Sequence, residues 1–591
     1  MRKFSGIQVS NGVAFGEAYL LDRSRICVVQ RNITREQIPE EIRRLRGAIE
    51  KSKTQMQEIK KRAGSVSDKY AIILDTYTLL LEDDILVNET IENIEKDLLN
   101  AEWALTITLE KFTKLFNNIN DEYLKGKQDD LDLVVHGVIK NLVGHEQENL
   151  SDIDRPVVLI AHAISPSDTI LMPRQYVLGM GTEAGGKTSH VGIFASALGI
   201  PAVVGVPDLT QQVNSGETVI IDGINGEIII DPDEEHYELY KRKQQNYLRY
   251  EKTLLKEVNE PSTTRDGHPV QLMGNIESSH EVKSVLRFGG EGIGLYRTEY
   301  LYLGNSRDLP TENDLYQNFK DVVRAVHPAP LVIRTLDIGA DKPLPGLDQK
   351  AEENPALGLR GIRLSLKNPI HLINQMKGAL RASLYGKIKI LYPMISYAEE
   401  VTEANRYLQK AKEELRKEQI PFDEDIQIGA MIETPAAALS VRQILKVTDF
   451  ISIGTNDLIQ YLLAVDRANE NVAHLYQPFH PAILAVLKLI FDAAAQANKP
   501  VAICGELGGD PMATALLLGL GNVHELSMDP HSIPKVKKIL RELTLDEARQ
   551  LADKALALDT AEEIDSFIRE EMRKRFPYDF DRDSAFGEKT A

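Results

Sequence analysis

The residues with the most evident chemistry lie at the ends of short β-like segments in the second half of the sequence. Arginines occur at Arg297 in GLYRTE, at Arg334 in IRTLDIGADK, at Arg360 and Arg363 in ENPALGLRGIR, and at Arg467 in LLAVDR. A guanidinium group binds a phosphate or a carboxylate through two parallel hydrogen bonds. Arginines that converge on one point therefore favour a small substrate that carries both groups.

Two carboxylates and a thiol lie in the same region. Glu433 follows MI in MIETP, Asp457 follows Asn456 in GTNDL, and Cys504 begins CGEL. Carboxylates on neighbouring strands could hold one hard divalent cation, with oxygens of the substrate completing its shell. The thiol could exchange a proton with a substrate carbon. Any one of these residues is explained equally well by a structural ion pair, but the whole set on successive strand ends favours a site.

A histidine in the first half of the chain has a different setting. His190 follows Gly185-Gly186 and Thr188-Ser189 and precedes residues 191–198, which have helical character. The N-terminus of a helix favours an attached phosphoryl group, and an exposed imidazole is a nucleophile. One histidine among thirteen, taken alone, is better explained as a capping or packing residue. Its longer sequence context therefore has to decide between these interpretations.

Periodicity indicates the elements that position these residues. After Pro261, eight β-like segments alternate with helical ones, at residues 270–276, 292–296, 331–335, 388–393, 427–433, 449–454, 500–505 and 524–528. Eight strand–helix units predict a (β/α)₈ barrel of the TIM type, whose active site lies at the C-terminal ends of the strands. A doubly wound sheet is the alternative, but eight units fit a closed barrel better.

The first half combines β-like runs with a helical region. The runs are at residues 7–21, 157–161, 176–179, 202–206, 218–221 and 227–230. Asn225-Gly226, between the last two, predicts a hairpin. Residues 40–142 instead show the apolar periodicity of amphipathic helices. We therefore expect an α/β multidomain chain in which a helical bundle is inserted into a β/α domain.

Composition restricts the classes of function. The 591 residues carry a formal net charge of −19 and only two cysteines, Cys27 and Cys504. An acidic chain does not suit nucleic-acid binding, and two distant cysteines build no disulfide framework. The start, MRKFSGIQVSNG, lacks the apolar run of a signal peptide, and no apolar stretch is long enough to span a bilayer. We expect a cytoplasmic protein without membrane insertion.

The full string around the histidine, GGKTSHVGIFASALGIPAVVG, closely resembles the phosphohistidine segment of phosphoenolpyruvate-utilising enzymes. Further motifs extend the likeness: GLYRTE, RTLDIGADK, ENPALGLRGIR, GTNDLIQYLLAVDR and CGELGGD. With these the chain resembles Enzyme I of the sugar phosphotransferase system, from about residue 4 to residue 570. LLLEDD and DEYLK in the helical insertion match as well.

The resemblance implies a phosphotransferase that takes phosphate from phosphoenolpyruvate onto His190, releases pyruvate, and passes the phosphate to a histidine of a small phosphocarrier protein. This would be the first step of sugar transport. Thr169 and Lys187 would support the phosphohistidine, and Cys504 would protonate the pyruvate enolate. Glu433 and Asp457 would hold Mg²⁺. Substrate binding would fall to Arg297, Arg334, Arg360, Asn456, Asp457 and Arg467.

The resemblance also implies an organisation into domains. Residues 1–30 and 145–231 would form a swivelling phosphohistidine domain, and residues 31–144 an inserted domain that docks the phosphocarrier. Residues 232–261 would form a linker helix, residues 262–575 the phosphoenolpyruvate-binding barrel that also makes a homodimer, and residues 576–591 a polar tail. Because one histidine must meet both the barrel and the carrier, we expect the phosphohistidine domain to swivel about its linkers.

The sequence departs from the usual family text near the histidine and in the insertion. Lys187 replaces an arginine, Ser196 replaces another, and Asp130-Leu131-Asp132-Leu133 replaces Asp-Val-Arg-Asp. A catalytically weakened regulatory member of the family is therefore an alternative. A phosphoenolpyruvate synthase or pyruvate phosphate dikinase is a further one, but the insertion is shorter than most nucleotide-binding domains and has no Gly-rich phosphate loop.

Overall fold

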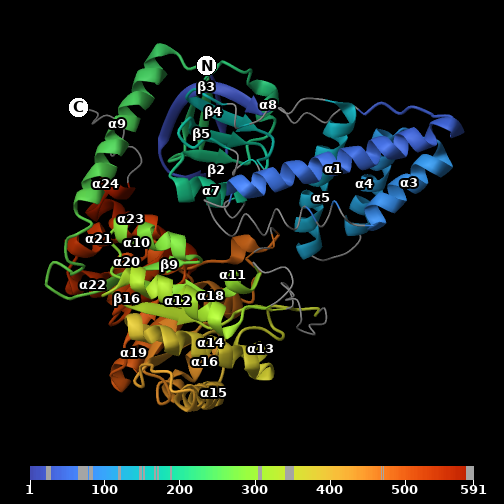
Figure 1. Cartoon of the computed structure of the whole chain (residues 1–591). Helices are drawn as coiled ribbons and strands as arrows, with labels where there is room; N and C mark the ends of the chain where they lie inside the picture. Colours follow the sequence, from blue (N-terminus) through green and yellow to red (C-terminus); the bar gives the residue numbers. More distant parts are fainter. Residues whose placement is uncertain are drawn as a thin grey trace. The chain divides into compact units, whose positions relative to one another are not determined.

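The computed structural model describes residues 1–21, 28–63, 78, 81, 84–117, 122–144, 150, 153–164, 168, 172–186, 190–303, 309–339, 352–467, 469 and 471–580. The chain divides into two compact units, Met1–Leu248 and Arg249–Ala591, whose elements are labelled in Figure 1. Within the described residues no helix has both the length and the apolar character needed to cross a bilayer.

The first unit contains an eight-stranded sheet in the order β1-β8-β7-β3-β4-β5-β6-β2. The strands are β1 Arg2–Ser5, β2 Ile7–Ser10, β3 Val13–Leu21, β4 Val157–Ala161, β5 Val177–Thr182, β6 Ala202–Val204, β7 Thr218–Asp222 and β8 Glu227–Ile230. Strands β3 to β6 pair in parallel, and the other pairs are antiparallel. Parallel neighbours need a crossover connection. The connection from β3 to β4 contains the helical insertion, and that from β5 to β6 contains α7, His190–Leu198.

The hairpin predicted at Asn225-Gly226 is confirmed. Strands β7 and β8 pair in register from Val219 with Ile230 to Asp222 with Glu227. The buried Asp222 carboxylate accepts hydrogen bonds from the backbone N–H groups of Ile224 and Asn225, both at 3.0 Å. Gly226 has φ = 71°, a left-handed conformation that side chains disfavour. The turn therefore depends on the same two residues, Asn225 and Gly226, from which the hairpin was predicted.

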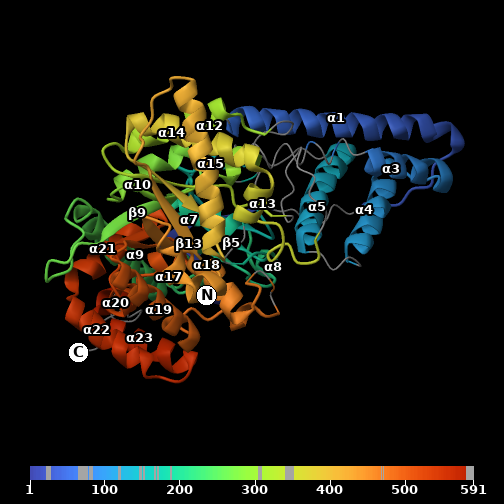
Figure 2. The same ribbon diagram turned by 90° about the horizontal axis from the view of Figure 1, so that it is seen from below.

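The helical insertion forms a bundle with its own apolar core. Its helices are α1 Ile38–Ala63, α3 Asp84–Asp97, α4 Ala101–Asn117 and α5 Glu122–Val143, with a 3₁₀ turn η1 at Arg35–Gln37. Leu45, Ile94 and Val135 lie in the core without exposure, and α1 runs across the shorter helices (Figure 2). Of residues 72–81, within the region predicted to be helical, only Thr78 and Leu81 belong to the described residues.

The second unit is a closed barrel of eight parallel strands, which confirms the predicted (β/α)₈ fold. The strands are β9 Gln271–Ile276, β10 Ile293–Arg297, β11 Leu331–Arg334, β12 Ile388–Tyr392, β13 Gln427–Ile432, β14 Phe450–Ile453, β15 Val501–Ile503 and β16 Glu525–Met528. Strand β16 pairs with β9, which closes the barrel. The carboxyl ends of all eight strands therefore meet at one mouth, where a barrel places its chemistry.

Helices surround the barrel. They are α10 Val282–Arg287, α11 Glu299–Leu303, α12 Glu312–Val326, α13 Ile362–Lys367, α14 Pro369–Ala382, α15 Ala398–Lys417, α16 Pro435–Leu439, α17 Val441–Ile444, α18 Thr455–Leu463, α19 Pro481–Ala497, α20 Thr514–Leu520, α21 Ile533–Glu542, α22 Leu545–Leu556, α23 Ala561–Arg575 and α24 Pro577–Phe580. Short 3₁₀ turns lie at η3 Ser279–Glu281, η4 Ser383–Tyr385, η5 Ala473–Leu475, η6 Glu506–Gly509 and η7 Pro530–Ser532.

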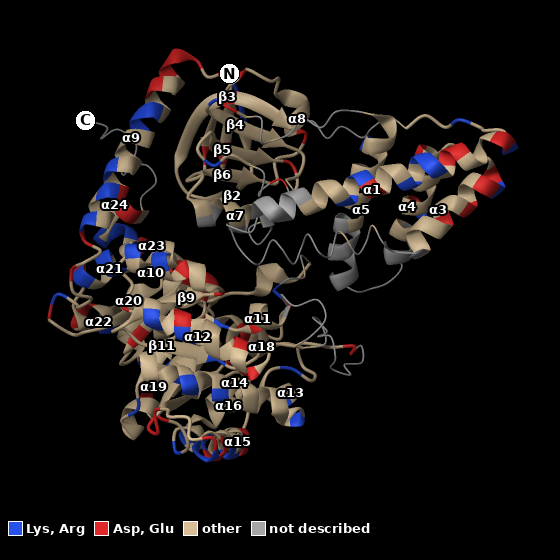
Figure 3. Ribbon diagram, viewed as in Figure 1, with Lys and Arg blue, Asp and Glu red and all other residues tan. Residues whose placement is uncertain are grey.

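Helix α15 shows why these segments are helical. Its buried residues recur every three or four positions, at Val401, Ala404, Leu408, Ala411, Lys412 and Leu415. This spacing places them on one helical face, while acidic and basic side chains occupy the rest of the surface (Figure 3). Glu399 and Glu400 stand in the first turn and Arg416 and Lys417 in the last, as the helix dipole favours.

A connecting helix, α9 Glu234–Lys256, spans the division between the two units. Tyr250, in its second half, donates a hydrogen bond to the carboxylate of Asp579 in α24. Lys538 of α21 donates to the other oxygen of that carboxylate at 2.6 Å, and only 1% of the Asp579 side chain is exposed. The predicted tail thus contributes its first residues to the packing of the second unit.

The substitution Asp579→Ala should lower the free energy of unfolding of the second unit by about 3 kcal/mol, because the Lys538 ammonium loses its buried carboxylate. Thermal denaturation measures the change. The matched control is Asp492→Ala, which removes an exposed ion pair with Lys488 and should cost less than about 0.5 kcal/mol. Equal destabilisation by both variants would contradict the role given to Asp579.

Candidate active site

The mouth of the barrel begins with an arginine held by two carboxylates. Arg334, the last residue of β11, donates to Glu299 Oε1 at 2.8 Å and lies 3.1 Å from Asp337 Oδ2. Burial opposes the charge of Arg334, but the neighbouring carboxylates outweigh this effect and raise its pKa above the ordinary value. Its Nε atom is buried and has no hydrogen-bond partner among the described residues. One face of the guanidinium is thus fixed and one N–H donor is left unused.

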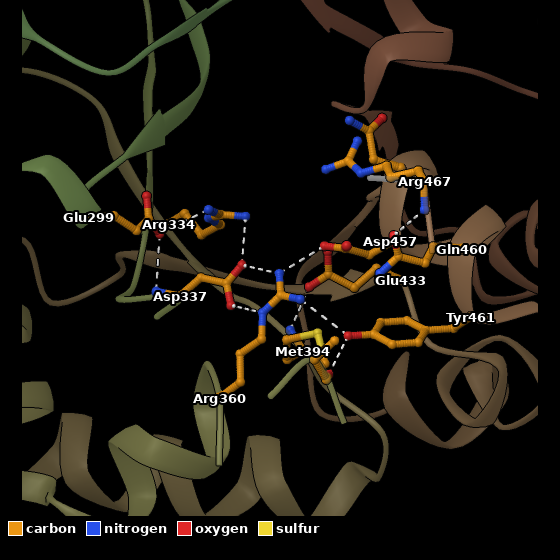
Figure 4. Close-up of polar contacts among 12 residues, drawn as sticks. Glu299, Arg334, Asp337, Arg360, Met394, Glu433, Asp457, Gln460, Tyr461 and Arg467 are labelled. Carbon is orange, nitrogen blue, oxygen red and sulfur yellow. Dashed lines mark hydrogen bonds and ion pairs between the residues drawn. The ribbon is translucent and has the colours of Figure 1, made fainter. Parts of the chain in front are cut away.

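Arg360 connects the two sides of the site (Figure 4). Its guanidinium donates to both oxygens of Asp337, at 3.0 and 3.1 Å, and to Asp457 Oδ2 at 3.0 Å. It also donates to the hydroxyl of Tyr461 at 3.2 Å. Burial opposes the charge, yet the two carboxylates together raise the pKa of Arg360. A single side chain therefore ties the loop after β11 to helix α18.

Glu433 lies directly after β13 and is 1% exposed. The backbone N–H of Met394 donates to its Oε1 at 2.6 Å. Burial, followed by the charges of Asp457 and Asp337, raises the pKa of Glu433 to about 8. Close packing needs glycine at Gly454, because a Cβ there would lie 2.5 Å from Glu433 Oε2. The carboxyl group is thus held protonated at neutral pH.

The outer rim of the mouth is more exposed. Asn456 accepts a hydrogen bond from the backbone of Glu506 at 2.7 Å and donates to its carboxylate at 2.9 Å. Arg467 lies 3.4 Å from the same carboxylate. On the other side Arg297, the last residue of β10, donates to Glu277 Oε1 at 3.1 Å. These contacts place both arginines at the rim, each with a carboxylate that an anionic ligand can replace.

Cys504 directly follows β15 and lies inside the barrel. It is 2% exposed and shares an apolar cluster with Leu295, Val332, Leu391, Met431 and Phe450. Its Sγ lies 3.7 Å from the carbonyl oxygen of Ile453. Burial, followed by the charge of Glu433, raises the pKa of the thiol to about 11. The group is therefore a protonated thiol at neutral pH, the form that can donate a proton.

In the first unit, α7 begins at His190, one residue before the helix predicted over residues 191–198, so His190 stands at a helix N-terminus as expected. The helix packs in one apolar core with β4, β5 and β6 through Val191, Phe194 and Ala195. Thr169 and Lys187, the predicted supports of the phosphohistidine, lie outside the described residues, and so does Ser196 as a side chain. The structure therefore places the candidate acceptor at the start of a helix without testing its neighbours.

The structure brings together half of the eight barrel residues chosen from sequence and adds partners that were not chosen. Arg334, Arg360, Glu433 and Asp457 form one buried cluster. Glu299, Asp337, Tyr461 and Glu506 are additions. The first two stand within the motifs GLYRTE and IRTLDIGADK, beside the arginines that they bind, so their position in these motifs was an available signal.

The charges of the cluster indicate what it can accept. It contains two guanidinium and four carboxyl groups, those of Arg334, Arg360, Glu299, Asp337, Glu433 and Asp457. Carboxylates exceed cations by two when all are ionised, which suits a divalent cation. Among the described residues no group of three or more His, Cys, Asp or Glu side chains is placed to hold a metal. Mg²⁺ that is bound to a substrate phosphate nevertheless usually takes only one or two carboxylate ligands from the protein.

Known protein families match the chain along most of its length. The matching descriptions are "PEP-utilising enzyme, N-terminal" for residues 5–127, "PEP-utilising enzyme, mobile domain" for residues 153–226 and "PEP-utilising enzyme, PEP-binding domain" for residues 251–545. The last of these covers all eight strands of the barrel and all the site residues at its mouth. The fold, the site and these matches thus place the chain in the class of phosphoenolpyruvate-utilising enzymes.

Full-length relatives narrow this class. The chain is 41% identical over 574 residues to the phosphoenolpyruvate-protein phosphotransferase of Bacillus subtilis (strain 168), covering 97% of this chain and 100% of the relative. It is 39% identical over 567 residues to that of Haemophilus influenzae, covering 96% and 98%. The chain belongs to the phosphoenolpyruvate-protein phosphotransferase family, known as Enzyme I. Its reaction is phosphoenolpyruvate-dependent phosphotransfer through a histidine.

The raised pKa of Glu433 gives stability a specific dependence on pH. The folded pKa is about 8 against an ordinary value of 4.5, so the folded protein holds the extra proton between these values. Stability is therefore lost as the pH rises through this window. Glu433→Gln removes this titration. With a chelator present, the melting temperature of the variant minus that of wild type should therefore be larger at about pH 9 than at about pH 5.

The matched control for this pH series is Glu399→Gln on the exposed face of α15, which should change the melting temperature equally at both pH values. A difference between Glu433→Gln and wild type that is constant with pH would show that Glu433 is already ionised in the folded protein.

Proposed function

We propose that His190 is the phosphoryl acceptor and that the buried arginine–carboxylate cluster of the barrel binds phosphoenolpyruvate. The single observation that carries the second part is the guanidinium of Arg360 shared between Asp337 and Asp457. It belongs to a largely buried set of six ionisable groups at the mouth of a (β/α)₈ barrel, where small anionic substrates bind. The resemblance around GGKTSH supports the first part.

The arginines and Asn456 bind the substrate in this proposal. Arg334 and Arg360 receive the phosphoryl oxygens, because each is fixed by carboxylates on one side. Arg297, Arg467 and Asn456 line the rim and bind the remaining oxygens. Fixed guanidinium groups offset the charge that develops on the phosphoryl group during transfer, without reorganising as it moves.

Glu433 and Asp457 would hold Mg²⁺, which supplies electrostatic stabilisation of the phosphoryl oxygens when bound. The excess of carboxylates in the cluster and the raised pKa of Glu433 support this assignment. Glu433 would hold the cation in its ionised form, because a positive charge favours the ionised carboxylate. Asp457 meanwhile keeps its hydrogen bond from Arg360 through Oδ2.

The chemical step transfers the phosphoryl group from the enol oxygen to an imidazole nitrogen of His190. The bond between phosphorus and the enol oxygen breaks, a phosphorus–nitrogen bond forms, and pyruvate enolate remains in the barrel. Cys504 then gives its thiol proton to the enolate carbon, and solvent restores the proton to sulfur. The neutral imidazole that must attack is the prevailing form near neutral pH.

Family membership supports the partners in this proposal. A small phosphocarrier protein takes the phosphoryl group from His190 onto its own histidine, and the helical insertion docks this carrier. The phosphohistidine domain swivels about its linkers between barrel and carrier, Thr169 and Lys187 support the phosphohistidine, and the barrel makes a homodimer. The protein acts in the cytoplasm in the first step of phosphoenolpyruvate-dependent sugar transport.

Incubation with phosphoenolpyruvate and Mg²⁺ should add one phosphoryl group at His190, detected by mass spectrometry under alkaline conditions that preserve phosphohistidine. His190→Ala should acquire none, because the acceptor nitrogen is gone. His236→Ala, at another histidine near a helix start, should be labelled like wild type. Labelling at another position in wild type, or by ATP alone, would overturn the assignment.

Cys504→Ala should lower the rate of pyruvate formation about a hundredfold, the usual scale of a lost general acid, while phosphoenolpyruvate binding changes little. Stopped-flow assay of pyruvate and titration calorimetry separate the two quantities. Cys27→Ala, at the other cysteine of the chain, serves as the control. Unchanged pyruvate formation by Cys504→Ala would exclude the thiol as the proton donor.

A further inference from the structure

The sheet of the first unit presents a second histidine at the end of a strand. His162 directly follows β4, and Glu183 directly follows β5. The Nδ1 atom of His162 lies 2.5 Å from Glu183 Oε2. The histidine side chain is 67% exposed, whereas that of Glu183 is only 13% exposed. The pair thus joins the carboxyl ends of two neighbouring parallel strands and presents the imidazole to solvent.

Glu183 is itself fixed from a third element. Its Oε1 accepts hydrogen bonds from the backbone N–H and the hydroxyl of Thr210, at 2.6 and 2.5 Å, in α8 Leu209–Gln212. Partial burial opposes its charge, but the hydrogen bonds from His162 and Thr210 outweigh burial and hold its pKa below the usual range. An ionised carboxylate therefore accepts the Nδ1–H of His162, and this bond directs the Nε2 side of the ring away from Glu183.

Stability alone does not explain this arrangement. An ion pair with an exposed partner contributes only about 0.2–1 kcal/mol. A second histidine–carboxylate contact among the described residues of this unit, that of His236 with Asp233, spans three residues at the start of α9, where Asp233 also accepts the backbone N–H of His236. That contact is a local feature of a helix start. The pair of His162 and Glu183 instead connects separate strands and orients an exposed ring.

The edge of the sheet that carries His162 is the edge where α7 starts. Strands β4, β5 and β6 are parallel, and α7 lies in the crossover from β5 to β6. A helix that follows a strand in such a crossover begins at the carboxyl end of that strand. The N–H of Ala184 also donates to the carbonyl of His162 at 2.8 Å. Ala184, which precedes α7 along the chain, thus lies beside His162, and Val191 shares an apolar core with Ala161.

We propose that His162 is a phosphoryl-binding residue, which donates a hydrogen bond from Nε2–H to a phosphoryl oxygen on His190. This inference rests on the proposed role of His190 as the acceptor. A phosphoryl group carries about two negative charges at neutral pH. An imidazole between a carboxylate and a phosphoryl group takes up a second proton, because both anions favour its charged form. The resulting charge-assisted hydrogen bond holds the phosphoryl group in place for transfer.

Rates of self-phosphorylation test the proposal in the full-length protein. His162→Gln should lower kcat for phosphorylation of His190 by about tenfold, the scale of one lost charge-assisted hydrogen bond. KM for phosphoenolpyruvate should stay within about twofold, because His162 belongs to the first unit and the substrate to the barrel. Glu183→Gln should produce a smaller loss, and His236→Gln, the matched histidine–carboxylate control, no loss. Equal rates for His162→Gln and wild type would overturn the proposal.

A spectroscopic measurement tests the contact independently of rate. In ¹⁵N-histidine-labelled protein, the Nε2 signal of His162, assigned by its loss in His162→Gln, should move to the doubly protonated position when phosphoenolpyruvate and Mg²⁺ phosphorylate His190. The signal of His236 should not move. If His190 is phosphorylated and the His162 signal does not move, the role proposed for His162 is overturned, but the assignment of His190 as the acceptor stands. Wild-type protein without phosphate on His190 would overturn the assignment of the acceptor, and this inference with it.

Discussion

The site in the barrel depends on one guanidinium group that two carboxylates share. Arg360 binds Asp337 from the loop after β11 and Asp457 from the first turn of α18. A buried charge is stable only when it is paired, and removal of either carboxylate would leave it under-compensated. The positions of the loop after β11 and of the start of α18, and with them the shape of the mouth, are therefore coupled to a single side chain (Figure 4).

The pairing of the two buried arginines with other carboxylates also determines the protonation state of Glu433. Because Arg334 and Arg360 are engaged by other carboxylates, they do not compensate Glu433 fully, and burial raises its pKa to about 8. The site is thus preorganised, but the positive charge of its arginines does not suffice to ionise Glu433 at neutral pH. On the function proposed here, a cation and the anionic substrate would bind together more readily than either alone, since each improves the electrostatic environment of the other.

Most of the architecture could be predicted from the sequence because each strand–helix unit carries its own periodicity. The hairpin at Asn225-Gly226 and the start of α7 were equally local signals. Asn456 and Asp457, expected at a strand end, lie in the first turn of α18 instead, since no pattern separates β14 from the helix that follows. The pairing of His162 with Glu183 had no signal, because only strand pairing brings these positions together.

The contact of Tyr250 with Asp579 has a consequence for the order in which the protein is made. The two residues are separated by 329 positions in the chain. Synthesis proceeds from the N-terminus, so the connecting helix leaves the ribosome long before its anchoring carboxylate exists. The second half of α9 therefore obtains this anchor only after the whole barrel has been translated. A chain that terminates before α24 would keep the strands of the barrel but lack this attachment of its connecting helix.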